Sequence, residues 1–141
     1  GYPTAEEESD ILLRFERDTV LPSLEAVTAA AEVELMQEAV TTIRVDESVR
    51  TYIVSIVQAT REHNGLTLGA SPRAGLALYK TAQAKAAIEG REFVTPDDIK
   101  ALVAPVLGHR LILTTNSRLH GRTAEQLVSD VLSSVPVPIE R

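Results

Sequence analysis

Arg73 is the residue whose type and position most clearly suggest chemistry. Ser71 and Pro72 precede it. Serine at an N-cap and proline at the first helical position are typical of a helix start. A cation in the first turn of a helix is disfavoured by the helix dipole unless an anion lies close by. A guanidinium beside free N–H groups is a good receptor for phosphate. An exposed arginine with its head in water is the plainer interpretation, and the residues alone leave both open.

Other patterns that could carry chemistry are weak or missing from the sequence. None of the seven glycines precedes a lysine, so the phosphate loop G-x-x-x-x-G-K-[ST] does not occur. His63, His109 and His120 have no partner at metal-ligand spacing, so no metal site is predicted. Asp97 and Asp98 form a carboxylate pair, but their place in a first helical turn explains them without catalysis.

Composition and charge exclude several classes of protein. The 141 residues, 44% hydrophobic and 24% charged, suit one globular domain. No cysteine is present, which excludes disulfides and thiol catalysis. Short apolar runs and an acidic beginning predict neither a membrane span nor a signal peptide. The net charge is −6, and residues 1–38 hold ten acids and two bases, so we expect no nucleic-acid partner.

Capping residues and hydrophobic spacing predict an all-α fold, a small bundle of about six helices. The predicted helices begin at or just after Thr4, Thr28, Asp46, Ser71, Thr95 and Thr123. The first four end near Arg17, Thr41, His63 and Gly90. Residues 18–28 are predicted to be mostly loop and residues 63–70 to form a loop. Order is expected to end at Pro136 and Pro138.

The same patterns predict which side chains are buried. The first helix should bury Ile11, Leu12 and Phe15. The clearest stripe lies on the third helix and comprises Val49, Tyr52, Ile53, Ile56, Val57 and Thr60. Stripes on the last two helices comprise Ile99, Leu102, Val103, Val106 and Leu107, and Leu127, Val128, Val131 and Leu132. Lys80 and Lys85 are expected on the outer face of the fourth helix, without a special role.

Two further features affect the expected geometry. Pro105 lacks a backbone donor and disfavours a helical conformation at Ala104, so we expect a kink or a break near residue 103. Short β-type pieces precede the helix starts at Asp46 and Thr95. Val45 and Val94 are therefore predicted to pair as a tiny two-stranded β bridge beside the bundle.

The stretch Leu68-Gly69-Ala70-Ser71-Pro72-Arg73-Ala74 resembles the C-terminal lid of MoxR-type AAA+ ATPases. The resemblance continues in order along nearly the whole chain. Its other segments are Gly1-Tyr2-Pro3, Val45-Asp46, Tyr52-Ile53-Val54, Ala59-Thr60-Arg61, Ala84-Lys85-Ala86, Gly90-Arg91-Glu92-Phe93-Val94, Pro96-Asp97-Asp98-Ile99 and His109-Arg110-Leu111. Such an ordered set is far more specific than any single motif.

This resemblance implies a fold of AAA+ lid type and a set of functional residues. Arg73 would be the sensor-2 arginine, a catalytic residue that reaches the γ-phosphate of ATP bound to a separate core domain. Ser71 and Pro72 would lie with it at the nucleotide. The cofactors would be ATP and Mg²⁺ in the full-length parent, with none bound tightly by this chain. Arg61 and Arg110 match family positions, but the sequence gives them no physical role.

The resemblance also implies partners and a location. The lid would contact the AAA+ core of its own chain and neighbouring subunits of a homo-oligomeric ring. The parent would act as a chaperone on client proteins, often ones with von Willebrand factor A domains, in the cytoplasm. Residues 1–3 would be the exit from the core, residues 4–135 the lid and residues 136–141 a tail. The beginning at Gly1-Tyr2-Pro3 looks like a cut at a domain boundary.

The nucleotide-binding core is missing from this sequence, so we expect that the chain alone folds but does not hydrolyse ATP.

Two other functions stay open. A free-standing helical adaptor would use its acidic first helix as the partner surface, and Arg73 would then be incidental. A small nucleic-acid-binding helical domain is the third possibility, but the negative charge and the lack of a basic helix argue against it.

Overall fold

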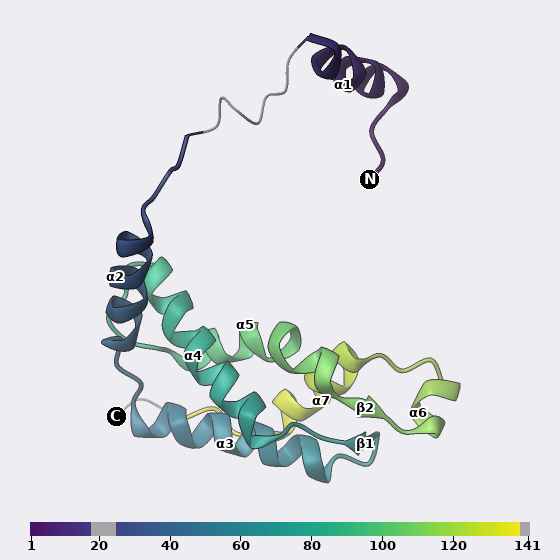
Figure 1. Cartoon of the computed structure of the whole chain (residues 1–141). Helices are drawn as coiled ribbons and strands as arrows, with labels where there is room; N and C mark the ends of the chain where they lie inside the picture. The colour runs from purple at the N-terminus through teal and green to yellow at the C-terminus, as the bar shows by residue number, and fades with distance from the viewer. Residues whose placement is uncertain (18–24, 139–141) are drawn as a thin grey trace. The chain divides into compact units, whose positions relative to one another are not determined.

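The structure is a computed structural model that describes residues 1–17 and 25–138. Within these residues it has seven α-helices, one 3-10 helix and two short strands (Figure 1). The chain divides into two compact units, Gly1–Leu35 and Met36–Arg141. The prediction of an all-α fold with a tiny β element is confirmed.

The first unit contains helix α1 (Ala5–Arg17). A capping box starts it: the Glu7 N–H donates to Thr4 Oγ1 at 3.3 Å, and the Thr4 N–H donates to Glu7 Oε2 at 2.7 Å. The predicted burial of Ile11, Leu12 and Phe15 is wrong, because these side chains are 46%, 72% and 70% exposed. An amphipathic stripe on a helix is buried only where another element packs against it, and no described residue covers the stripe of α1 enough to bury it.

Helix α2 (Ala30–Thr41) crosses the boundary between the two units. It begins just after Thr28, whose hydroxyl donates to Glu32 Oε2 at 2.7 Å, and it ends at the predicted residue. None of its residues is buried. Most of the loop expected over residues 18–28 lies outside the described residues; Glu25 to Thr28 have no regular structure.

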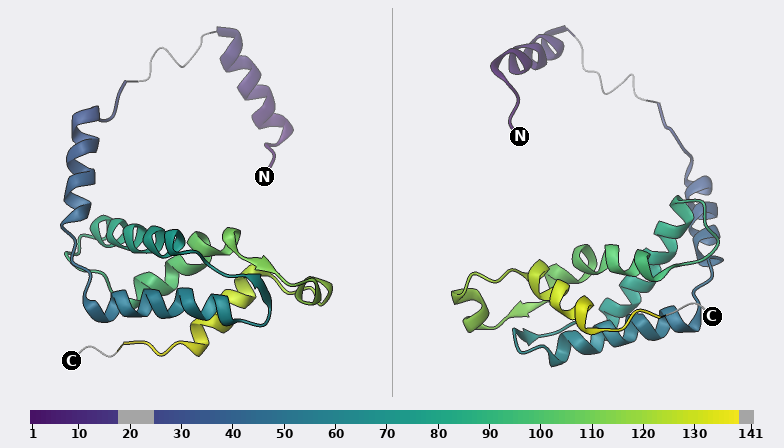
Figure 2. Two further views of the ribbon diagram at one scale, coloured as in Figure 1. Left: turned by 60° about the horizontal axis from the view of Figure 1, so that its bottom comes forward. Right: turned by 180° about the vertical axis from the view of Figure 1, so that it is seen from behind.

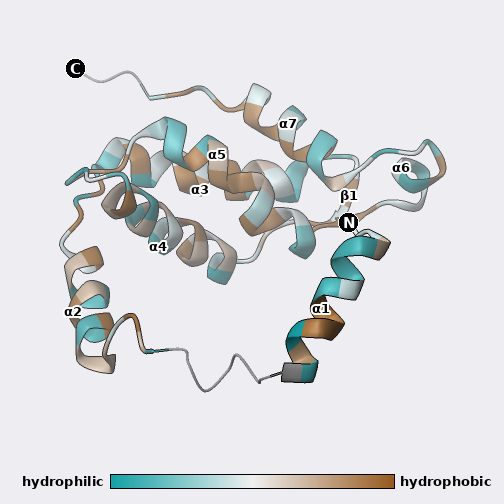
Figure 3. Ribbon diagram, turned by 90° about the horizontal axis from the view of Figure 1, so that it is seen from above, coloured by the Kyte–Doolittle hydropathy of each residue, from teal (hydrophilic) through white to brown (hydrophobic). Residues whose placement is uncertain are grey.

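The second unit is built round helices α3 (Glu47–Glu62), α4 (Pro72–Ile88), α5 (Pro96–Leu107) and α7 (Ala124–Ser134), which pack together as Figure 2 shows from two sides. Every member of the predicted stripe on α3 is buried. The stripes on α5 and α7 also face the core, with Leu102, Val106 and Leu132 only partly buried. Hydrophobic segments of α3 and α5 lie at the centre of this unit (Figure 3).

Helix α5 runs without interruption to Leu107, so of the expected kink or break near residue 103 the break is wrong. Pro105 removes one N–H donor, but the Gly108 N–H still donates to the Ala104 carbonyl oxygen and closes the last turn. Val103 and Leu107 are fully buried, and their packing favours the continuous helix.

The small β elements differ in part from the prediction. The predicted bridge forms one residue earlier, between Arg44 and Phe93, where the Val94 N–H donates to the Arg44 carbonyl oxygen at 3.0 Å. Strands β1 (Leu66–Leu68) and β2 (Ile112–Leu113) pair antiparallel, so residues 63–70 are not all loop.

Short elements complete this end of the unit. The 3-10 helix η2 (Gly108–Arg110) links α5 to β2, and helix α6 (Thr115–Leu119) follows β2. Sequence periodicity does not predict these elements, because strands of two or three residues and a five-residue helix are too short to show a period.

Candidate functional site

The candidate site is built on the first turn of α4. The Ala74 N–H donates to Ser71 Oγ at 3.4 Å, and Pro72 occupies the first helical position, so the predicted cap is confirmed. No acidic side chain lies in this turn, whereas α1, α2, α3, α5 and α7 each carry one or more there. The positive end of the α4 dipole is therefore not neutralised by the helix's own residues.

Arg73 projects from this turn and is exposed. Within the described residues its guanidinium makes no hydrogen bond or ion pair. Among the described residues, neither a first-turn carboxylate nor a neighbouring acid neutralises the charge of Arg73. This turn therefore offers an anion from elsewhere both a guanidinium and a helix N-terminus.

The start of α4 is held against the end of α3 by a polar clamp, formed by Thr60, Gly69 and Ala70. Thr60 is fully buried, and its hydroxyl accepts from the Ala70 N–H at 2.9 Å while donating to the Val57 carbonyl oxygen at 2.6 Å. A Cβ on Gly69 would lie 2.6 Å from the Thr60 carbonyl oxygen and from the Arg61 nitrogen. Only glycine allows this approach of the two backbones.

The structure gives positions to the two arginines that the sequence left without a role. Arg61 and Arg110 line one open pocket of about 520 Å³ together with Thr67, Ser71 and the segment 68–70. Arg61 Nε donates to the Ala70 carbonyl oxygen at 2.8 Å, which adds a second link between α3 and the residues before α4. The pairing of β1 with β2 brings these two arginines together, and spacing along the sequence does not reveal that pairing.

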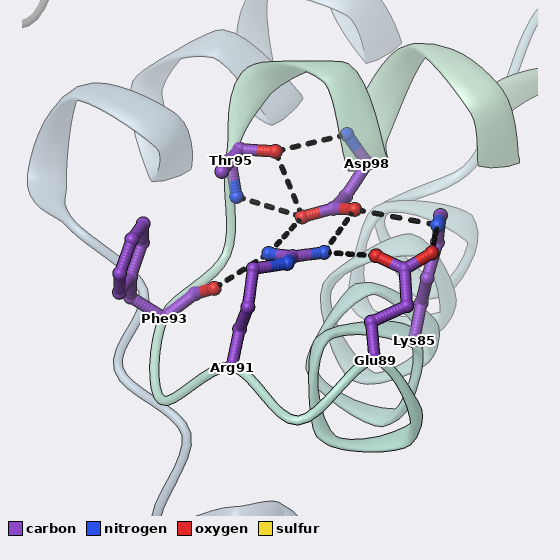
Figure 4. Close-up of polar contacts among 6 residues, drawn as sticks. All are labelled: Lys85, Glu89, Arg91, Phe93, Thr95 and Asp98. Atoms are coloured by element: carbon purple, nitrogen blue, oxygen red, sulfur yellow. Dashed lines mark hydrogen bonds and ion pairs between the residues drawn. The ribbon is translucent and has the colours of Figure 1, made fainter.

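A second polar cluster joins the other end of α4 to the start of α5 (Figure 4). Arg91 donates to both carboxylate oxygens of Asp98, at 2.7 and 2.8 Å, and to the Phe93 carbonyl oxygen at 2.9 Å. Asp98 also completes a capping box with Thr95. Asp97 and Asp98 both lie in the first turn of α5, which confirms the interpretation of the pair as helix-start acids.

Burial raises the pKa of Asp98, but hydrogen bonds from Arg91 and Thr95 outweigh it and lower that pKa to about 2. The Asp98 side chain is only 4% exposed, and it is charged at neutral pH within a saturated set of donors. Both oxygens of this carboxylate already accept hydrogen bonds, so neither is free to take a proton from a substrate. The cluster therefore fixes α4 against α5 rather than performing acid–base chemistry.

Lys85 belongs to this cluster, contrary to the expectation of an outer-face residue without a role. It forms an ion pair with Glu89 and lies 3.5 Å from Asp98 Oδ1, and its side chain is only 28% exposed. The spacing of four residues between Lys85 and Glu89 was visible in the sequence and could have indicated the pair.

The histidines do not converge on a metal site in the structure. His63 Nε2 lies 3.8 Å from Asp130, and His109 accepts from Arg110 Nε at 3.1 Å. Over the described ranges, no group of three or more side chains suited to metal binding occurs. No helix in those ranges is long and apolar enough to cross a membrane.

Comparison with known proteins identifies relatives along the whole chain. The model of the AAA lid domain family matches residues 58–131. YeaC, an uncharacterized protein of Bacillus subtilis (strain 168), is 41% identical over 141 residues, which are 100% of this chain and 44% of YeaC. Chaperone MoxR1 of Mycobacterium tuberculosis (strain ATCC 25618 / H37Rv) is 31% identical over 147 residues, covering 98% of this chain and 38% of MoxR1.

A solved structure shares the fold. The crystal structure of "a putative ATPase" from Cytophaga hutchinsonii matches with a TM-score of 0.82 and 26% identity, over 99% of this chain and 45% of that protein. The chain spans less than half the length of each of these three relatives.

The matched region runs from within α3 into α7 and contains the polar clamp, both pocket arginines and Arg73. The sequence resemblance is therefore confirmed: the chain belongs to the AAA lid domain family and is of the MoxR type.

Proposed function

We propose that this chain closes over ATP bound to an AAA+ core domain and that Arg73 contacts the γ-phosphate as the sensor-2 arginine. The observation that carries this proposal is an exposed guanidinium, without a partner among the described residues, on a helix start that is held rigidly. Ser71 and Pro72 shape the adjoining backbone. A phosphate group fits this donor set, because guanidinium and helix N–H groups bind oxyanions well.

Magnesium would be held by the core rather than by this chain, since the described residues offer no cluster of acidic ligands. The lid contributes binding and orientation: Arg73 stabilises negative charge on the phosphate as it develops. Without a core the chain hydrolyses no ATP. The clamp at Thr60 and Gly69 transmits a displacement of Arg73 to α3, because the two helices are joined there through backbone contacts.

The relation to MoxR1, which is named a chaperone, supports the rest of the proposal. The full-length protein would form a homo-oligomeric ring in the cytoplasm and use the lid movement to act on client proteins, including ones with von Willebrand factor A domains. Residues 4–135 would move as the lid, between the core exit at 1–3 and the tail at 136–141.

Hydrolysis by the full-length protein that carries this lid tests the role of Arg73. Replacing Arg73 with alanine should lower the ATPase rate by about 10²–10³-fold, because one phosphate contact is lost in the transition state. Arg73→Lys should recover only part of the rate, since lysine keeps the charge but not the fork of donors. Arg118→Ala is the matched control, because Arg118 is also exposed but lies on α6.

Unchanged circular dichroism would show that the Arg73 variants are folded. A rate for Arg73→Ala within twofold of the parent would remove Arg73 from the nucleotide site. It would favour instead a helical interaction module without nucleotide coupling.

A further inference from the structure

The pocket beside the start of α4 is strongly cationic for an acidic protein. Its lining residues include two arginines, Arg61 and Arg110, and the hydroxyl residues Thr67 and Ser71, but no acidic residue. The whole chain has a net charge of −6. Two positive charges at one open pocket in such a chain repel each other and gain from an anion between them.

Arg61 is positioned in this pocket before any ligand arrives. Its Nε donates to the Ala70 carbonyl oxygen at 2.8 Å, and the close approach at Gly69 fixes that segment against α3. The terminal nitrogens of its guanidinium make no hydrogen bond or ion pair with the described residues. A guanidinium anchored through Nε loses little rotamer entropy when its free ends bind an oxyanion.

Arg110 reaches the same pocket from the opposite part of the chain. Pairing of Leu68 with Ile112 in the two-stranded sheet brings η2 next to the residues that precede α4. Its Nε donates to His109 Nε2 at 3.1 Å, and its terminal nitrogens are also without a partner in the described part of the chain. By contrast, Arg91 is saturated by Asp98 and Glu89, and Arg122 pairs with Asp130.

We propose that the pocket formed by Arg61 and Arg110 binds a phosphate group. Two guanidiniums match the double negative charge and the several acceptor oxygens of a phosphate better than a single carboxylate. This inference rests on the proposed function, which would bring a nucleotide close to the pocket. Ser71 lines the pocket, and Arg73, the proposed γ-phosphate contact, follows two residues later. The phosphate would belong to the nucleotide on the core or would be free inorganic phosphate.

Equilibrium binding to the full-length protein tests the proposal, with ADP, ATPγS and inorganic phosphate as probes. Arg110→Ala should weaken binding of at least one probe by about ten- to a hundredfold, the range for a charge-assisted hydrogen bond. Arg110→Lys should lose less. Weaker ADP or ATPγS binding identifies a nucleotide phosphate, and a loss confined to inorganic phosphate identifies the free anion.

Arg61→Lys provides a second variant, because lysine retains a donor for the Ala70 carbonyl oxygen while removing the free guanidinium ends. Arg118→Ala is again the control, and thermal unfolding shows whether each variant is folded. Unchanged affinity for all three probes in both pocket variants would overturn the proposal. So would unchanged affinity with altered subunit association, which would make an acidic protein surface the ligand.

These outcomes are separate from those that test Arg73. Loss of hydrolysis in Arg73→Ala with full phosphate affinity in Arg110→Ala would leave the lid function intact and remove only the pocket. The reverse result would keep the pocket and reject Arg73 as the γ-phosphate contact.

Discussion

At the residue scale, the carboxylate of Asp98 connects two helices through several hydrogen bonds and ion pairs. It accepts hydrogen bonds from Arg91 and Thr95, and it lies close to Lys85. This single side chain therefore caps α5 and ties it to the end of α4. Burying a charge is costly unless it is paired and hydrogen-bonded, and Asp98 meets both conditions.

The depressed pKa of Asp98 makes stability depend on acid pH. Its folded pKa of about 2 lies below the ordinary value of 3.8, so its contribution is complete above about pH 4 and is lost as the pH falls through 2. We expect Asp98→Asn to lower the free energy of unfolding at pH 7 by about 2 kcal/mol. The difference from wild type should shrink towards pH 2, as measured by urea unfolding.

Asp97→Asn is the matched control for this prediction, since Asp97 is the adjacent acid but its side chain is 87% exposed. It should change stability little at any pH. An Asp98→Asn difference that stays constant from pH 7 to pH 2 would contradict the assigned role of the charge.

At the scale of elements, Gly69 decides where α4 begins relative to α3. A Cβ there meets backbone atoms at 2.6 to 2.7 Å, and backbone cannot move aside as a flexible side chain can. We expect Gly69→Ala to lower the free energy of unfolding by about 1–3 kcal/mol, the usual cost of overpacking. Chemical denaturation of the purified chain measures it.

Gly108, unlike Gly69, has open space where a Cβ would lie. Nothing lies within 4 Å of a Cβ at Gly108, and its φ of −53° is ordinary helical geometry. Gly108→Ala should therefore be neutral or raise stability by about 0.4–1 kcal/mol. Equal effects of the two substitutions would contradict the claim that backbone contact requires glycine at Gly69.

The elements differ in how far the sequence could predict them. The cap at Asp46 and the stripe from Val49 to Thr60 specify α3 completely, because a sixteen-residue helix shows its period several times. The stripe on α1 predicts the helix equally well but not its burial, since burial needs a partner that periodicity does not supply. Strands β1 and β2 depend on pairing between distant segments, which no local pattern reports.

At the scale of the whole molecule, the two parts of the candidate site differ in whether a local sequence pattern can predict them. Ser71, Pro72 and Arg73 are consecutive, so the local capping pattern is enough to predict them. Arg61 and Arg110 are 49 positions apart and meet only because β2 returns beside β1. The sequence could therefore predict the cation at the helix start but not the pocket next to it.

The proposed function requires that Arg73 contacts the γ-phosphate of ATP held by a core domain. The affinity of the full-length protein for ATPγS and for ADP, measured before and after Arg73→Ala, tests this contact. We expect ATPγS binding to weaken by about tenfold or more while ADP binding is unchanged, because ADP lacks the γ-phosphate. Equal affinities for ATPγS in the parent and the variant would contradict it.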